Sequence, residues 1–233
     1  MKRTKLSDRV LPTYSKGEEI FNMVTHIVGA SLGVIAMVLC IIVSAIHGNG
    51  YGVVSSVIYG ITMITLYTMS SIYHGLSPKT KAKKVFQILD HCTIFLLIAG
   101  SYTPFALVLF REYDPVVGWS IFGMIWGMAI LGIVLNSIDL KKYRVFSMIC
   151  YLIMGWAVIF RVDLLIKLLE PVGIVLLVLG GIAYTIGAIL YGIGKKRKWM
   201  HSIFHLFIFL RKFITIFFYL TICDMKIKKR VFI

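Results

Sequence analysis

The chain has 233 residues, of which 59% are apolar and 15% charged, and its mean hydropathy is +0.88. A soluble domain is nearer half apolar and a quarter charged, because its surface must face water, so this composition excludes a water-facing globule. The 25 Lys and Arg against 10 Asp and Glu would suggest nucleic acid in a soluble protein. Here the basic residues cluster between apolar stretches, where they set membrane orientation, and we expect no nucleic-acid partner.

Seven apolar segments are each long enough to cross a bilayer, which takes about 20 residues of helix. They are residues 20–46, 51–76, 85–110, 116–138, 145–168, 171–193 and 199–222. We therefore expect an all-α membrane protein, a seven-transmembrane helix bundle over residues 20–222. A polar tail at 1–19 precedes the bundle and a basic tail at 223–233 follows it. The first apolar run is too long for a signal-peptide core, so we expect no cleaved signal.

Lys and Arg are distributed unevenly between alternate loops. Five lie in the N-terminal tail, four at 79–84, three at 141–144 and four at 195–198, whereas the opposite side offers Arg111, Arg161 and Lys167. Since cytoplasmic loops carry the excess of positive charge, we expect the N-terminus in the cytoplasm and the C-terminus outside. Four basic residues after the seventh segment conflict with this orientation: Lys226, Lys228, Lys229 and Arg230.

Ionisable residues inside membrane-spanning segments are costly, so each marks a candidate functional site. His74 lies near the end of the second segment, and Asp90 lies about five residues into the third. His201 and His205 lie near the start of the seventh segment. By helical rise and the expected topology, these residues lie roughly 3 to 9 Å below the same cytoplasmic interface. Three distant segments are thus expected to bring three imidazoles and a carboxylate to one level.

This set of residues suits a metal ion. His201 and His205 are four residues apart, so they share one helix face and can bind one ion. With His74 and a water they match an open, catalytic zinc site, in which zinc lowers the pKa of the water towards ~7. Asp90 is placed to orient or deprotonate that water, and Ser70 to donate to a developing oxyanion. The alternative is that the histidines are packing or interfacial residues, because two histidines fall at this spacing by chance fairly often.

Three short motifs lie in these segments. They are Glu19-x-x-Asn22-x-x-Thr25-His26, then Ser70-x-x-x-His74 followed by Leu89-Asp90-His91, and His201-x-x-x-His205. Together they resemble the hemolysin III family, within the progestin and adipoQ receptor (PAQR) superfamily, over roughly residues 17–210. The resemblance implies a seven-helix membrane protein with its N-terminus inside. It also implies zinc held by His74, His201 and His205, with Asp90 reaching the metal through water and Ser70 close by.

Two further groups of residues stand out. Glu19, Asn22 and His26 share one helix face, and we expect them to support the site by tethering the first helix to the zinc helices rather than by catalysis. After Leu210 the sequence departs from the family with Arg211 and Lys212, roughly 18 Å into the last segment by helical rise. A charge near mid-membrane costs about 2.5–3.5 kcal/mol on the insertion scale, and Asp163 is a candidate partner for Arg211.

Three functions compete. The first is a zinc-dependent, ceramidase-like hydrolase that cleaves an amide or ester of a membrane lipid, since eukaryotic members of the resembled family are receptors linked to such hydrolysis. The second is a pore-forming hemolysin, the label of bacterial members. The third is a seven-helix receptor or sensor without catalysis. We expect the protein in the cell membrane, as a multi-pass protein of a bacterial inner membrane.

Overall fold

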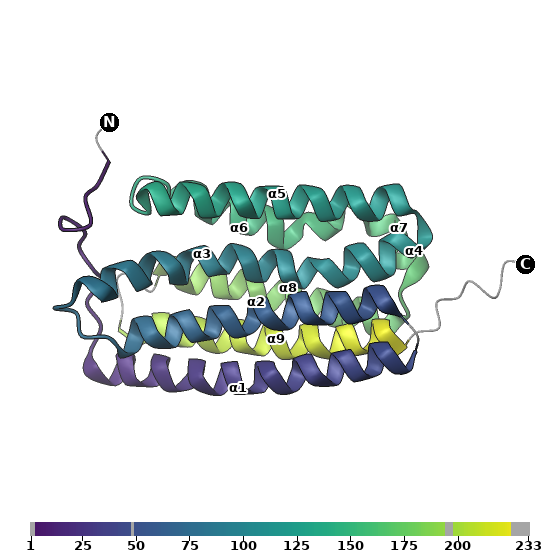
Figure 1. The fold of residues 1–233 in the computed structure, drawn as a ribbon, viewed down its shortest axis with the longest axis horizontal. Helices are drawn as coiled ribbons and strands as arrows, with labels where there is room; N and C mark the ends of the chain where they lie inside the picture. Colours follow the sequence, from purple (N-terminus) through teal and green to yellow (C-terminus); the bar gives the residue numbers. More distant parts are fainter. Residues whose placement is uncertain (1–2, 48, 194–197, 225–233) are drawn as a thin grey trace, which may run out of the picture.

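The computed structural model describes residues 3–47, 49–193 and 198–224, and helices dominate them. Within this part of the chain, seven helices or helix runs are long and apolar enough to cross a membrane. They are α1 (Lys16–Ile46), α2 (Gly50–Gly75), the run α3 (Lys81–Pro104), η1 (Phe105–Phe110) and α4 (Arg111–Tyr113), α5 (Pro115–Asp139), the run α6 (Arg144–Trp156), η2 (Ala157–Arg161) and α7 (Val162–Leu168), α8 (Pro171–Ile193) and α9 (Met200–Asp224). They lie side by side in one bundle (Figure 1). The predicted all-α fold with seven long apolar helices is confirmed.

Side-chain caps decide where four of the helices begin, because the first backbone N–H groups of a helix have no partner inside it. The caps are Ser15, Asn49, Thr80 and Asp114, whose side chains accept hydrogen bonds from the backbone N–H of Glu18, Gly52, Lys83 and Val116. Ser15 and Thr80 each lie five residues ahead of a predicted apolar segment, so α1 begins at Lys16 and α3 at Lys81, earlier than expected. The first turns of α1 and α3 therefore carry charged side chains into the bundle.

The third and fifth spans contain irregular turns whose backbone groups are satisfied inside the bundle. The third continues through the π-helical η1 after Pro104, and the fifth narrows to the 3₁₀ turn η2. At that turn the Tyr102 hydroxyl donates to the Gly155 carbonyl (3.1 Å) and accepts from the Val158 N–H (3.0 Å). A membrane interior supplies no water for such groups, so a neighbouring helix must supply the partner.

The spans differ widely in how much of their apolar stretch is buried. The apolar stretch of the third span is 89% buried, whereas that of α5 is only 22% buried and exposes residues such as Ile130 and Val134. The outer faces are thus suited to hydrocarbon.

The core also depends on glycine at close approaches: Gly100 lies against the Thr62 side chain and Gly132 against the Phe95 ring. Such small residues let helices approach in lipid.

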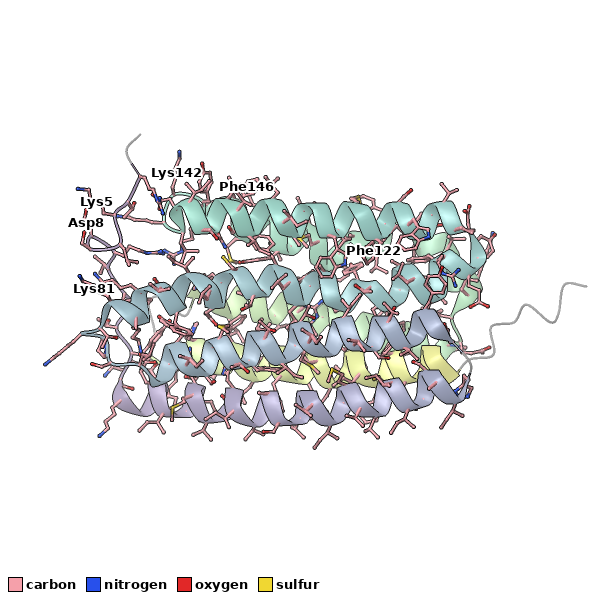
Figure 2. The ribbon with its side chains drawn as sticks, in the orientation of Figure 1. Lys5, Asp8, Lys81, Phe122, Lys142 and Phe146 are labelled. Carbon is pink, nitrogen blue, oxygen red and sulfur yellow. The ribbon has the colours of Figure 1, made fainter. Side chains whose placement is uncertain are left out.

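The start of α1 and the end of α9 lie at opposite ends of the bundle (Figure 1). We call the end at which α1 begins the basic end, since Lys5, Lys81 and Lys142 lie there together (Figure 2). Residues 3–15 cross this end and are tied to it: the Thr4 N–H donates to Asp139 Oδ2 (2.8 Å) and Lys84 Nζ to the Ser7 carbonyl (2.6 Å). The basic residues at 195–197 and 226–230 lie outside the described residues.

The predicted pairing of Arg211 with Asp163 is wrong. Asp163 instead forms an exposed ion pair with Arg161, two residues before it, with 3.3 Å between Nε and Oδ1. The buried Arg211 guanidinium lies over the Tyr184 ring, 4.1 Å from its centroid. A ring face attracts a cation and more strongly where water is excluded, so Tyr184 supports this charge inside the bundle.

Candidate metal centre

His74 of α2 and His201 and His205 of α9 converge at the basic end. One ligand nitrogen from each lies within 4.8 Å of those of the other two, and the described residues contain no other such group of three. Nε2 of His201 and Nε2 of His205 are 3.0 Å apart. Two nitrogens held 2.0–2.1 Å from a tetrahedral zinc are separated by about 3.3 Å, so the spacing fits two ligands of one ion. This three-histidine cluster could hold a metal.

Some buried polar atoms, on the cluster itself and on α1 and α2, have no hydrogen-bond partner. His74 Nε2 and Ser70 Oγ are buried and have no hydrogen-bond partner among the described residues, and the same holds for both side-chain polar atoms of Asn22. Buried polar groups in native proteins are normally paired, so the orphaned Nε2 of His74, a member of the cluster, calls for a bound ion or water. Three imidazoles are donors that zinc accepts. The residues present therefore fit the predicted ion.

Glu19 links the first turn of α1 to the histidine of α2. His74 Nδ1 donates to Glu19 Oε2 over 2.7 Å, and Lys83 Nζ donates to Glu19 Oε1 over 2.7 Å. A metal-binding histidine commonly donates its other ring N–H to a carboxylate, which fixes the tautomer and the ring orientation. With Nδ1 carrying the proton, the lone pair of His74 is on Nε2, the orphaned atom.

Glu18, the residue before it, links α1 to α9. It accepts from the Ser15 N–H at Oε2 (2.8 Å) and from the Trp199 N–H at Oε1 (2.6 Å). Trp199 has φ of 64°, a left-handed conformation uncommon outside glycine, and precedes His201 by two residues. Sequence reasoning did not find this contact: Ser15-x-x-Glu18 has the pattern of a capping box, but that pattern carries no sign of a bond to a distant turn.

Two more rings enclose the histidines. His26 stands edge-on to His205, with centroids 4.4 Å apart, and its Nδ1 donates to the Asn22 carbonyl over 2.7 Å. Tyr14 stacks on His201 with centroids 4.9 Å apart and planes 22° apart. Burial raises the pKa of the Tyr14 phenol well above its usual value, so this ring stays neutral. His26 was predicted to support the site, whereas Tyr14 was not singled out from the sequence.

Asp90 lies outside the three-histidine cluster and lines a cavity beside it. This cavity, of about 640 Å³, lies between residues 10–14 and the ends of the helices, and Asp90, Tyr73 and His201 form part of its wall. We call it the polar chamber. His91 also borders it, with Nδ1 donating to the Gln87 carbonyl (2.8 Å). His91 thus has a hydrogen-bond partner on its own helix and does not belong to the three-histidine cluster.

A second, smaller cleft reaches the cluster from the side of the bundle. It has a volume of about 150 Å³ and lies between α1, α2 and α9, with His26 and His205 at its inner wall. Val24, Val28 and Leu206 line it and are 46–47% exposed on the outer surface. We call it the lateral cleft. His205 is therefore approached by apolar surface on one side, while His201 borders the polar chamber.

Comparison with known proteins agrees with the motifs. A family model described as haemolysin-III related matches residues 14–216, a range that includes the three histidines, Glu19 and Lys83. Hemolysin-3 of Bacillus cereus is 40% identical over 191 residues, which cover 82% of this chain and 85% of that protein. The Hemolysin-3 homolog of Bacillus subtilis (strain 168) is 39% identical and covered to 87%. The human monocyte to macrophage differentiation factor is 27% identical over 198 residues, which cover 82% of this chain and 78% of that protein.

Proposed function

The chain belongs to the haemolysin-III related family, and from this membership and its histidine cluster we propose that it is a zinc-dependent hydrolase of a membrane-lipid amide or ester. The observation that carries the proposal is the convergence of three imidazoles, one with an orphaned Nε2, at one end of an apolar bundle. Three protein ligands leave one position of a tetrahedral ion open, which is typical of catalytic rather than structural zinc.

The proposed location is the cytoplasmic side of a bacterial cell membrane. Lys81 and Lys142 lie with the N-terminal segment at the basic end (Figure 2), and cytoplasmic loops carry the excess of positive charge. The histidine cluster lies in the same end of the bundle, near the last turn of α2 and the first turns of α9. A site at this depth meets lipid headgroups and the first bonds of the acyl chains.

The chain's own residues have distinct tasks in the proposed reaction. Zinc, when bound, acts as a Lewis acid that activates water and polarises a carbonyl. Asp90, on the wall of the polar chamber, accepts a proton from the attacking water and returns it to the leaving amine or alcohol as the carbonyl–nitrogen or carbonyl–oxygen bond breaks. Ser70, one helical turn before His74, donates a hydrogen bond to the developing oxyanion. The products are a fatty acid and an amine or alcohol.

The two approaches to the cluster suit the two halves of a lipid. The lateral cleft is lined by Val24, Val28 and Leu206, so an acyl chain can lie there and remain in hydrocarbon. The polar chamber has Asp90, Tyr14 and Lys198 on its wall, so it suits the headgroup. The carbonyl between the two halves then lies beside the histidines. A water-soluble substrate would have no use for the lateral cleft.

The test is hydrolysis by the zinc-loaded protein in lipid nanodiscs. Ceramides, other N-acyl lipids and diacyl phospholipids are supplied in turn, and released fatty acid is measured by mass spectrometry. We expect release from at least one class, a fall of about 10²–10⁴-fold in Asp90→Asn, and no change in His47→Ala, a histidine exposed at the other end of α1. Zinc-loaded protein that releases no fatty acid, or release unaltered by Asp90→Asn, would overturn the proposal.

The name of the Bacillus cereus relative, Hemolysin-3, makes pore formation the second candidate. It is separated from hydrolysis by dye release from liposomes. A pore does not need His205 for its permeability, whereas a hydrolase needs this histidine for turnover. Leakage that is equal in the wild type and in His205→Ala, without lipid cleavage, would favour the pore.

A further inference from the structure

We propose that Lys83 is a positioning residue of the metal centre, which acts through Glu19 on His74. The inference rests on the proposed zinc site and adds to it a residue of α3. In the sequence, Lys83 is one of four lysines between the second and third apolar segments, all counted as loop charges that set orientation. In the structure Lys83 is buried, whereas the other three lysines are exposed or half-buried.

Lys83 is a buried cation with three acceptors. Its side chain is 1% exposed, and Nζ donates to Glu19 Oε1 (2.7 Å), to the Leu76 carbonyl (2.9 Å) and to the His74 carbonyl (3.5 Å). By contrast, Lys79 and Lys81 are exposed, and Lys84 reaches a carbonyl of the N-terminal segment. A lysine needed only for orientation keeps its ammonium in water, because burial of the charge costs several kcal/mol before pairing.

The buried Lys83 contacts the metal site through Glu19. Lys83 occupies one oxygen of Glu19, and the other oxygen accepts from His74 Nδ1 over 2.7 Å. A carboxylate paired with an ammonium is an acceptor only, so it selects the imidazole tautomer that has its proton on Nδ1. That tautomer leaves the lone pair on Nε2, the atom of His74 without a partner. Lys83 thus fixes Glu19, and Glu19 fixes the ligand.

The contact with α2 adds a second constraint on the same ring. The carbonyls of His74 and Leu76 belong to the last turn of α2 and its C-cap, and Lys83 Nζ bonds to both. A cation at a helix C-terminus stabilises the unpaired carbonyls there. Lys83 therefore holds the backbone of His74 as well as, through Glu19, its imidazole. One ammonium sets the position and the tautomer of one ligand.

Zinc affinity, measured by competition with a chelator on the full-length protein, tests the inference. We expect Lys83→Met and Glu19→Gln each to weaken zinc binding by about 10–100-fold, the usual effect of losing a partner of a metal-bound histidine. The double variant should lose clearly less than the two single losses combined, because part of the effect of Lys83 passes through Glu19. Lys83→Arg should restore most of the affinity, and Lys81→Met, an exposed lysine of the same helix, should change nothing.

Two further measurements separate positioning from folding. The visible absorption bands of the Co²⁺-substituted protein report ligand geometry, and we expect Lys83→Met to shift them. Lys83→Gln keeps a donor for the Leu76 carbonyl without the charge, so it decides the question where Lys83→Met fails to fold. Unaltered affinity and bands in the folded Lys83 variants, or losses that add fully in the double variant, would overturn the inference alone. A wild type without stoichiometric zinc would overturn the proposed function as well.

Discussion

Glu18 and Glu19, consecutive residues in the first turn of α1, bond to the two different elements that carry the metal centre. Glu18 accepts from the Trp199 N–H just before α9, and Glu19 accepts from His74 Nδ1 at the end of α2. Side chains of consecutive helical residues point about 100° apart, so one turn can serve two neighbours. α1 supplies no residue to the three-histidine cluster, yet it holds both helices that do.

The bond between Glu18 and Trp199 predicts an effect on stability and on metal binding together. Glu18→Ala removes half of a capping box and leaves the Trp199 N–H without its partner, so we expect a loss of about 1–3 kcal/mol in stability. Because the turn before α9 then loses this hydrogen bond to α1, zinc affinity should fall too. Thermal unfolding and chelator competition measure the two effects.

The control for that variant is Asp114→Ala. Asp114 caps α5 by accepting from Val116 and Val117, at the end of the bundle away from the histidines. We expect a similar loss of stability without a change in zinc affinity. Equal effects of both variants on zinc would show that the Glu18 bond has no special relation to the site.

The ring of Tyr14 predicts slow access of water-soluble molecules to the cluster. Tyr14 stacks on His201 and comes from the segment that crosses the basic end. Replacement by alanine removes this cover, so we expect a chelator to strip zinc several-fold faster from Tyr14→Ala, with little change in equilibrium affinity. Stopped-flow measurement of zinc release checks this. Tyr113→Ala, which alters an exposed tyrosine after η1, should release zinc at the wild-type rate.

The lateral cleft predicts which helix face selects the acyl chain. Val28 lines the cleft, whereas the neighbouring Ile27 is exposed to a similar extent and lies outside its lining. Val28→Trp should fill the cleft and lower the hydrolysis of long-chain lipids about tenfold or more, while Ile27→Trp should have no effect. Zinc content should stay the same in both. Equal turnover in the two variants would show that the lateral cleft does not bind the acyl chain.

The sequence was enough to predict the helices and the convergence of the histidines. Seven apolar runs determine seven spans, because a bilayer demands about 20 apolar residues each time. His74 and the His201–His205 pair were brought together by depth alone: the expected topology puts the second span's end and the seventh span's start at one face. Segment length, helical rise and the alternation of loops between the two membrane faces can all be read from the sequence.

The parts that the sequence did not yield depend on which helices touch. Lys83 looked like a loop charge because nothing in a run of lysines marks the one that an N-cap at Thr80 brings into the bundle. The Glu18–Trp199 bond joins residues 181 apart in the chain. The pairing of Arg211 with Asp163 was wrong because Arg161 lies closer to Asp163 and an aromatic ring receives the Arg211 charge. Each is a tertiary contact with no periodic signal.

The zinc content of the purified protein decides whether the three histidines form a metal site. We expect inductively coupled plasma mass spectrometry to find one zinc per chain in the wild type and in His47→Ala, whose histidine is exposed outside the cluster. His205→Ala should contain little zinc, because one of the three ligands is lost. A folded wild type without zinc, or a His205→Ala protein with as much zinc as the wild type, would contradict the account.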